Sequence, residues 1–439
     1  MLFVFKALNA IKSAPMKIFL DSIGCRLNQA EIERIARQFR AAGHEIVGDA
    51  ENADLAVVNT CTVTSQAAAD SRKVIRRAQR AGVDEIVATG CWVTMEPEKA
   101  AELSNKVVLN TEKETLVPDL LNLSLEAFDL EPLERVPLPG LRSRTRAFIK
   151  VQDGCDNECT FCITTVARGA GHSRSIKDIL ADVQSALDGG AQEIVLTGVH
   201  LGSWREHEDK GYSQISVLIR AILDETSTPR LRLSSLEPWE LESELFELWR
   251  DPRLMRHLHL PLQAGSDTVL RRMRRNTTRY EFRALVNAAR DVMPDVAITT
   301  DVIAGFPGET EVEFAETLEY VQEIAFADGH IFTYSPRQGT PAARMKGQVD
   351  KSTRKARNAA LREAFSEMGA SYKEKFVGEI MPVLWESNQS MSDAGWAVQG
   401  LTGNYLRVRA TASEPRWNQI DQVKLLSVDG DVLVGEIIK

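Results

Sequence analysis

Three cysteines at CxxxCxxC spacing constrain this chain more than any other feature. Cys155, Cys159 and Cys162 follow a strand-like run from Ala147 to Val151. Sulfurs this close in sequence must converge in a loop after the strand, and thiolates are the usual ligands of iron–sulfur clusters. With three ligands, one iron of a cubane would lack a protein ligand and could bind a small molecule. Zinc is the weaker alternative, because structural zinc prefers four ligands and this segment offers no His or fourth Cys.

The remaining three cysteines share a position relative to predicted strands. Cys25, Cys61 and Cys91 each end a short apolar run, and helix-like stretches at 28–42 and 67–81 alternate with these runs. Such alternation predicts parallel strands whose carboxyl ends lie at one edge of a sheet. We therefore expect the three thiols to meet and to hold a second, auxiliary cluster. The alternative is three small buried side chains, which cysteines often are.

Disulfide pairing of the six cysteines is a further alternative. The start of the chain lacks the basic residues, long apolar core and cleavage site of a secretion signal, so we expect a cytoplasmic protein without a membrane segment, in which disulfides are rare. Met16 directly precedes the first predicted strand, and residues 1–15 read as an extension or an upstream start.

The organisation of the chain predicts an α/β protein with three units. The boundaries expected are 16–134 for a parallel α/β sheet domain, 145–368 for a partial TIM-like barrel and 371–439 for a small all-β barrel. A proline- and glycine-containing linker at 136–140 separates the first two units. Six strand-like runs are expected in the central unit, at 147–151, 193–197, 231–234, 258–260, 298–303 and 329–332. The CxxxCxxC loop would then lie at the carboxyl face of the barrel, where active sites sit.

Two tri-cysteine sets in this order resemble the methylthiotransferase family of radical S-adenosylmethionine (SAM) enzymes. The resemblance extends over most of the chain from Met16 and is carried by the cysteine loop and four further motifs: Gly24-Cys-Arg-Leu-Asn-Gln-Ala-Glu31, Asn59-Thr-Cys-Thr-Val-Thr64, Leu260-Pro-Leu-Gln-Ala-Gly-Ser266 and Gly305-Phe-Pro-Gly-Glu-Thr310. The first two motifs fit best the bacterial MtaB-type branch, which acts on N6-threonylcarbamoyladenosine in tRNA. One departure is Thr164-Thr165-Val166, where the family usually has Ile-Pro-Tyr.

The resemblance implies two 4Fe-4S clusters and SAM as cofactors. Cys155, Cys159 and Cys162 would hold the SAM-binding cluster, and Cys25, Cys61 and Cys91 the auxiliary one. SAM at the first cluster would yield a 5′-deoxyadenosyl radical, which removes hydrogen from C2 of the modified adenosine at tRNA position 37; a methylthio group then replaces that hydrogen. A sulfur donor and an electron donor are implied without being identified, and the third unit would be a TRAM-like barrel.

Glycine turns after barrel strands are candidate SAM contacts. Thr197, Gly198 and Val199 end the second strand, and Gly305 and Gly308 follow the fifth, where backbone atoms could approach a ligand closely. An ordinary tight turn explains each of them equally well.

Basic residues indicate where tRNA would bind, although the net charge is −9. The run from Arg271 to Arg279 holds five arginines, Arg271, Arg272, Arg274, Arg275 and Arg279, which we expect to contact the RNA backbone away from the cluster loop. In the third unit Tyr405, Arg407, Arg409 and Trp396 are the candidate RNA contacts. A solvated helix face is the alternative for the arginine run.

Two other functions stay open on the sequence alone. One is methylthiolation of an aspartate in a small-subunit ribosomal protein, or of isopentenyladenosine in tRNA. The other is an iron–sulfur protein that binds nucleic acid without SAM chemistry.

Overall fold

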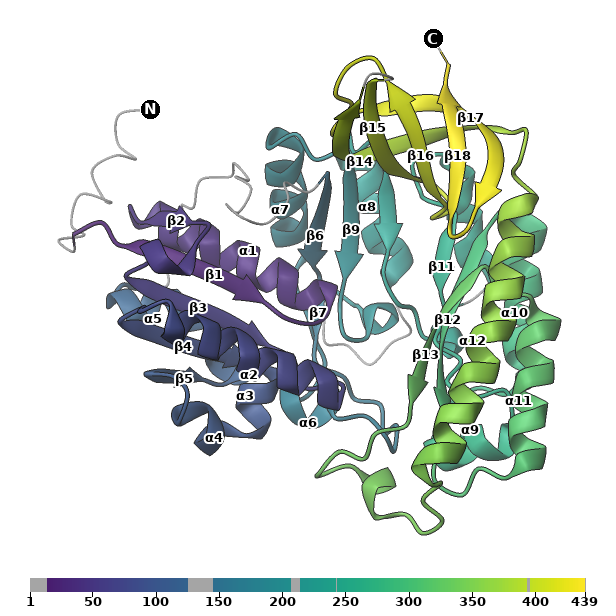
Figure 1. Ribbon diagram of the computed structural model, residues 1–439, viewed down its shortest axis with the longest axis horizontal. Coiled ribbons are helices and arrows are strands. Elements are labelled where there is room, and N and C mark those ends of the chain that lie inside the picture. The colour runs from purple at the N-terminus through teal and green to yellow at the C-terminus, as the bar shows by residue number, and fades with distance from the viewer. Residues whose placement is uncertain (1–13, 125–144, 207–213, 242, 393–394, 439) are drawn as a thin grey trace.

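The computed structural model describes residues 14–124, 145–206, 214–241, 243–392 and 395–438. The linker predicted at 136–140 lies outside these residues. Figure 1 shows an N-terminal α/β unit beside a central barrel, with a small β-barrel packed on one end of the central unit. Among the described residues, no helix combines the length and the apolar character needed to cross a membrane.

The N-terminal unit is a five-stranded parallel sheet in the order β2-β1-β3-β4-β5. Its strands are β1 (Lys17–Ser22), β2 (Glu45–Val47), β3 (Leu55–Thr60), β4 (Glu85–Gly90) and β5 (Lys106–Val108). The helices are α1 (Arg26–Ala41), α2 (Ser65–Arg80), α3 (Cys91–Met95), α4 (Pro97–Ala101) and α5 (Leu116–Leu121). Alternate strand residues bury opposite faces of the sheet: Val57 packs in the cluster that holds Phe39 of α1, and Val58 in the cluster that holds Ile75 of α2.

The central unit contains the six parallel strands that the sequence predicts. One sheet has the order β10-β9-β6 and the other the order β11-β12-β13. Parallel bridges from Leu231 to Leu254 and from Ser235 to His259 join the two into one curved wall, so the prediction of a partial TIM-like barrel is confirmed. The strands are β6 (Arg146–Lys150), β9 (Glu193–Thr197), β10 (Leu231–Leu233), β11 (His257–His259), β12 (Ala297–Ala304) and β13 (Asp328–Thr333).

Helices cover the outside of this wall (Figure 1). They are α7 (Ile176–Asp188), α8 (Ile215–Glu225), α9 (Asp267–Met273), α10 (Arg279–Val292), α11 (Glu311–Ile324) and α12 (Lys351–Glu374). A short helix, α6 (Thr164–Arg168), follows the cysteine loop, and β7 (Gln152–Asp153) pairs with β8 (His172–Ser173) at the base of that loop. Leu196, Leu233, Leu258 and Val302 are fully or almost fully buried in the core between wall and helices.

The C-terminal unit is a closed five-stranded barrel in the order β14-β15-β16-β18-β17, as expected for a TRAM-like domain. Its strands are β14 (Ile380–Ser392), β15 (Gly395–Thr402), β16 (Arg407–Ala412), β17 (Ile420–Asp429) and β18 (Val432–Ile437). A buried ionic cluster fixes this barrel to the central unit. Arg230 and Arg232 pair with Glu193 at 2.8 and 2.7 Å and donate to the carbonyl of Thr402 at 2.9 and 3.3 Å.

Candidate active site

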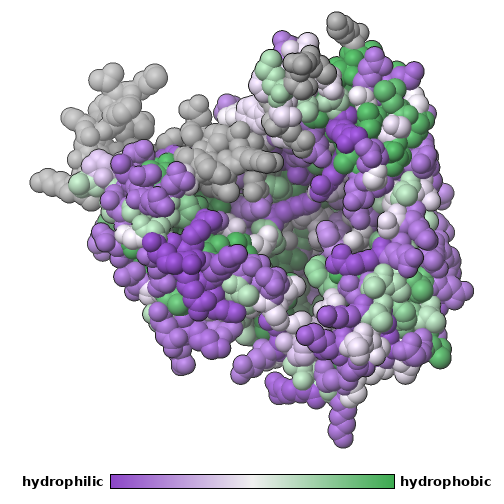
Figure 2. Space-filling model, viewed as in Figure 1, coloured by the Kyte–Doolittle hydropathy of each residue, from purple (hydrophilic) through white to green (hydrophobic). Residues whose placement is uncertain are grey.

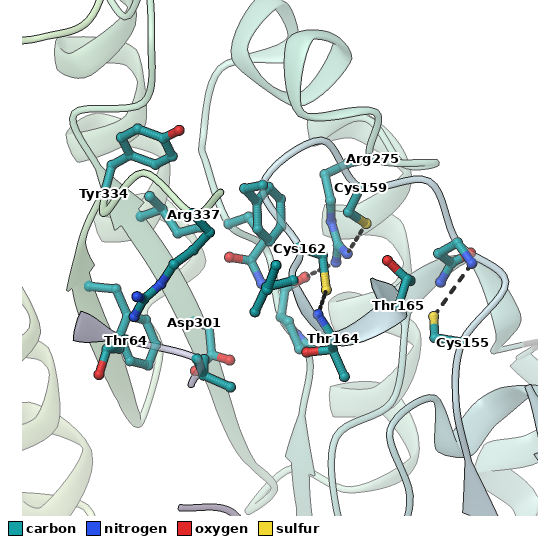
Figure 3. Close-up of a pocket in the computed structure, with 18 of the residues that line it drawn as sticks. Thr64, Cys155, Cys159, Cys162, Thr164, Thr165, Arg275, Asp301, Tyr334 and Arg337 are labelled. Carbon is teal, nitrogen blue, oxygen red and sulfur yellow. Dashed lines mark hydrogen bonds between the residues drawn. The ribbon is translucent and has the colours of Figure 1, made fainter. Parts of the chain in front are cut away.

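The CxxxCxxC loop lies between β7 and α6, and every thiol in it has a nitrogen donor. The backbone N–H of Asn157 donates to Cys155 Sγ at 3.4 Å, and that of Thr164 donates to Cys162 Sγ at 3.4 Å. Arg275 Nη1 donates to Cys159 Sγ at 3.6 Å, and Figure 3 shows these three bonds as dashed lines. Donors aimed at sulfur stabilise the thiolate form, which is the form that binds metal. Burial nevertheless raises the pKa of the Cys159 thiol to about 11 against the opposing effect of Arg275, so this thiol would lose its proton on binding a metal.

Gly154 shapes the start of the cysteine loop. Its φ is +68°, and a Cβ at this position would lie 1.9 Å from the carbonyl oxygen of Ala170. Only glycine fits both the conformation and the close approach. The chain therefore turns sharply from β7 into Cys155.

The other three cysteines also lie where the sequence places them. Cys25 immediately precedes α1, Cys61 follows β3 and Cys91 begins α3 after β4, so they stand at the carboxyl ends of three neighbouring strands. Burial, with smaller contributions from the nearby Cys25 and Cys91, raises the pKa of the Cys61 thiol to about 11. The structure thus places the three cysteines near one another, although their sulfurs do not form a compact metal-binding group, and their role as ligands stays a prediction.

A cavity of about 300 Å³ opens beside the first cysteine loop. Cys155, Cys159 and Cys162 line it, and Val63 and Thr64, which follow Cys61 in the N-terminal unit, line it as well. Figure 3 shows Arg337 and Tyr334 across the cavity from Cys155. The space-filling view also shows the surface hollowed between the N-terminal unit and the barrel (Figure 2). The cavity is therefore lined by both units: it adjoins the CxxxCxxC set directly and reaches the residues that follow Cys61.

Comparisons with known proteins agree with this geometry. Residues 17–110 match the model of "Uncharacterized protein family UPF0004", and residues 149–321 match that of the radical SAM superfamily. The chain is 34% identical to the threonylcarbamoyladenosine tRNA methylthiotransferase MtaB of Bacillus subtilis, with 96% of each chain covered. It is 35% identical to the MtaB of Thermotoga maritima, with 84% of this chain and 86% of that protein covered. The chain belongs to the radical SAM methylthiotransferase family.

One further curated relative and one solved structure are also similar to this chain. A tRNA-2-methylthio-N(6)-dimethylallyladenosine synthase of Maricaulis maris is 30% identical over 96% of this chain and 97% of its own length. Among solved structures, the radical SAM methyltransferase TsrM of Kitasatospora setae, with cobalamin and a [4Fe-4S] cluster bound, matches with a TM-score of 0.57. The match covers 75% of this chain and 77% of the TsrM chain, and because the identity is 15%, it shows the fold alone.

The family implies SAM and [4Fe-4S] clusters as cofactors, and the donor sets of this methylthiotransferase fit them. Each site offers three thiols, which suits a cubane with one open iron. Among the described residues, His259, Asp301 and His330 form the group whose potential ligand atoms lie close enough together to hold a single metal ion, and neither cysteine set is that compact.

The predicted SAM contacts are only partly at the cavity. Val199 lines it. Gly198 instead packs against Gln152, so closely that a Cβ added at Gly198 would lie 3.0 Å from Gln152 Oε1. Gly305 lies against Arg354 of α12, and Gly308 lies beside Gly347. Thr197 is buried at the end of β9. A role for these five residues in SAM binding stays a prediction.

The arginine run does not form one solvated face, and the expectation that it lies away from the cluster loop is wrong. Arg275 is buried, with a side chain 1% exposed, and pairs with Glu237 at 2.6 Å besides its bond to Cys159. The physical reason is the left-handed residue Arg274, which ends α9 and turns the chain inward. Arg272 pairs with Glu313 at 2.8 Å and Arg279 lies over the Tyr320 ring. Arg271 and Arg274 are exposed, and Arg274 pairs with Glu158 of the cysteine loop.

Tyr405 likewise has a different place from the one expected. Its ring stacks on His257 with 4.4 Å between centroids, and its hydroxyl accepts from Arg26 Nη2 at 2.8 Å. Tyr405 therefore joins all three units and is not placed as an RNA-stacking residue. Arg407 and Arg409 are exposed, and Trp396 is half-buried.

A second buried ionic cluster, centred on Arg168, lies between the loops of the two cysteine sets and was not predicted from the sequence. Arg168 Nη1 donates to Glu31 and Asp153, each at 2.9 Å, and Nη2 donates to Asn28 at 2.6 Å. Asn28 Oδ1 also accepts from Cys25 Sγ at 3.7 Å, and Asp153 lies two residues before Cys155. Arg168 thus connects the loops that carry both cysteine sets. Its partners are up to 140 residues away, so no local pattern could have revealed them.

The departure at 164–166 falls on the cavity wall. Thr164 and Thr165 line the cavity beside Cys162, and Val166 is exposed. The replacement of Ile and Pro by two threonines puts hydroxyl groups among the lining residues and leaves α6 intact.

Proposed function

We propose that this chain transfers a methylthio group to C2 of N6-threonylcarbamoyladenosine at tRNA position 37, giving the 2-methylthio derivative. The observation that carries the proposal is one cavity lined by the CxxxCxxC loop and by the residues that follow Cys61. A carbon in that cavity could be reached from both cysteine sets. The MtaB proteins of Bacillus subtilis and Thermotoga maritima, which carry this activity in their names, support the choice of substrate.

The six cysteines are the proposed cluster ligands. Cys155, Cys159 and Cys162 would hold the cluster that binds SAM, and Cys25, Cys61 and Cys91 the auxiliary cluster. SAM bound at the first cluster supplies the 5′-deoxyadenosyl radical. The chain's own contribution is to aim nitrogen donors at the sulfurs, to hold the two loops in register through Arg168 and to exclude water from the cavity.

We also propose the domain boundaries 16–134, 145–368 and 371–439, and a cytoplasmic location. An enzyme acting on tRNA with oxygen-sensitive clusters is expected in the cytoplasm. A sulfur donor and an electron donor are further expected partners.

The second candidate substrate is isopentenyladenosine, because a relative with that substrate class in its name reaches 34% identity over 86% of this chain. Anaerobically reconstituted protein should be given anticodon stem-loops that carry either modified base, with SAM, dithionite and sulfide. Mass spectrometry of the digested nucleosides should show the methylthio product from the threonylcarbamoyl substrate alone. Product from isopentenyladenosine alone, or modification of a ribosomal protein instead, would overturn the substrate assignment.

A further inference from the structure

The charged side chains that line the cavity leave one cation without a partner. Glu237 is paired with Arg275 at 2.6 Å. Asp301 Oδ1 lies 3.1 Å from His330 Nδ1 and 3.4 Å from His259 Nε2. Both lining carboxylates are thus engaged. Nε and Nη2 of Arg337 are buried and have no hydrogen-bond partner among the described residues. The residue as a whole is half-buried, but two of its three guanidinium nitrogens are shielded from water and lack an acceptor, which is costly, so the site is organised for an anion that arrives from outside.

Arg337 lies at the seam between the two units. It follows β13, and Ser335 Oγ, two residues before it, is 2.9 Å from Ser65 Oγ at the start of α2. Burial lowers the pKa of Arg337, and the nearby Cys61 and Glu96 oppose that change. Thr64 of the N-terminal unit lines the same cavity, and Figure 3 shows it beside Arg337. The guanidinium therefore stands on the side of the cavity that the N-terminal unit lines.

In the proposed reaction, the methylthio group comes from the auxiliary cluster, so C2 of the base must lie near the side of the cavity that the N-terminal unit lines. In the proposed substrate, C2 and the substituted C6 both adjoin N1 of the same ring, so the threonylcarbamoyl group lies close to the reacting carbon. Its carboxylate is the one anionic group on the base. Arginine binds carboxylates with two parallel hydrogen bonds, which fixes orientation as well as charge.

We propose that Arg337 binds the carboxylate of the threonylcarbamoyl group and so selects this base over neutral N6-substituted adenosines. The proposal rests on the proposed function, since it takes N6-threonylcarbamoyladenosine as substrate. It assigns to Arg337 a positioning and specificity role, separate from the holding of clusters or SAM.

The test compares two anticodon stem-loops that differ only at the carboxylate. One carries N6-threonylcarbamoyladenosine, and the other carries the same group with a neutral carboxamide. Fluorescence anisotropy under anaerobic conditions gives the Kd of each for reconstituted protein. Wild type should bind the carboxamide RNA about 10- to 100-fold more weakly, which is the range for a hydrogen-bonded charge pair. Arg337→Gln should bind both RNAs with the same Kd.

Two further variants control for charge and folding. Arg344→Gln removes one positive charge from an exposed position in the same segment, outside the cavity lining, and should keep the wild-type preference. Arg337→Lys keeps the charge without the planar fork and should keep part of the preference. Because Nε and Nη2 of Arg337 lack partners in the structure, the melting temperature of Arg337→Gln should equal or exceed that of wild type.

The outcomes separate this inference from the function on which it rests. If Arg337→Gln still prefers the carboxylate RNA, or if it loses SAM binding and RNA-free SAM cleavage instead, Arg337 does not read the substrate carboxylate. If wild type forms no methylthio product on the threonylcarbamoyl RNA and binds it no better than unmodified RNA, the proposed function fails and this inference falls with it.

Discussion

Replacement of Arg168 by glutamine should destabilise the junction between the two cysteine sets. The side chain is 2% exposed and bonds to Glu31, Asp153 and Asn28. Removal of one partner from a buried ion pair typically costs about 3 to 5 kcal/mol, because the remaining charge is left uncompensated. Lys113 remains 2.8 Å from Glu31, and Lys150 remains 2.8 Å from Asp153. We therefore expect a loss near the lower limit, about 3 kcal/mol.

Urea denaturation of the apoprotein, followed by tryptophan fluorescence, measures this loss. Trp92 is fully buried in the N-terminal unit and contributes to this signal together with the other six tryptophans of the chain. Arg77→Gln is the matched control: Arg77 pairs with Asp21 at 3.0 Å but is 61% exposed, so its loss should cost less than about 1 kcal/mol. A double-mutant cycle with Glu31→Gln should give a coupling of at least about 1 kcal/mol. Equal stabilities for Arg168→Gln and the control, or no coupling to Glu31, would refute the reasoning.

Three further predictions concern the clusters, the RNA and the barrel junction. Cys61→Ala should lower the iron content from about eight to about four atoms per chain, and this variant should still cleave SAM but form no methylthio product. Cys159→Ala should abolish the formation of 5′-deoxyadenosine. An unchanged iron content in a variant with Cys25, Cys61 and Cys91 all replaced by alanine would contradict the auxiliary site. Arg271→Gln with Arg274→Gln should weaken tRNA binding and flatten its salt dependence by about one unit per lost contact, whereas equal binding at every salt concentration would leave these exposed arginines as a solvated face. Arg232 and Arg230 lower the pKa of Glu193 to about 2, below its unfolded value near 4.5, so this carboxylate contributes stability above about pH 4.5 that is lost as the pH falls toward 2. Burial lowers the pKa of Arg230 to about 10, so Arg230 stays protonated throughout this range. Glu193→Gln should therefore flatten the decrease in stability that urea titration measures between about pH 5 and 3.

The sequence predicted the features that depend on local pattern. The six barrel strands and the three strands that precede Cys25, Cys61 and Cys91 are short, mostly apolar runs between helices, and parallel strands necessarily place their carboxyl ends at one edge. The prediction that Cys25, Cys61 and Cys91 lie near one another needed no knowledge of packing. The closed C-terminal barrel was also predictable, because turn residues at 403–404 and 429–431 separate its strands.

The arginine run shows why charge patterns are weaker guides. Arg274 and Arg275 are adjacent in sequence, yet one is exposed and the other is buried against Cys159 and Glu237. Which of them turns inward depends on the left-handed cap of α9 and on Glu237, 38 residues away. A run of like charges in the sequence indicates neither where the helix ends nor which distant carboxylate will pair with one of the arginines. Tyr405 was misplaced for the same reason, because its partners Arg26 and His257 belong to other units.

The seam between the N-terminal and central units combines apolar and polar contacts, and the polar ones have a functional consequence. The apolar contact, in which Ala30 packs with Phe148 and Val195, would by itself allow small sliding movements, because hydrophobic contact is not directional. The bonds of Arg168, by contrast, depend on distance and angle, and Asn28 and Asp153 link them to Cys25 and to the Cys155 loop. The separation between the two cysteine sets is therefore fixed by directional bonds. A reaction that needs one carbon within reach of both sets depends on that separation, whereas SAM cleavage depends on one set alone. Arg168→Gln should accordingly lower methylthio product per 5′-deoxyadenosine formed, and an unchanged ratio would show that the seam serves stability only.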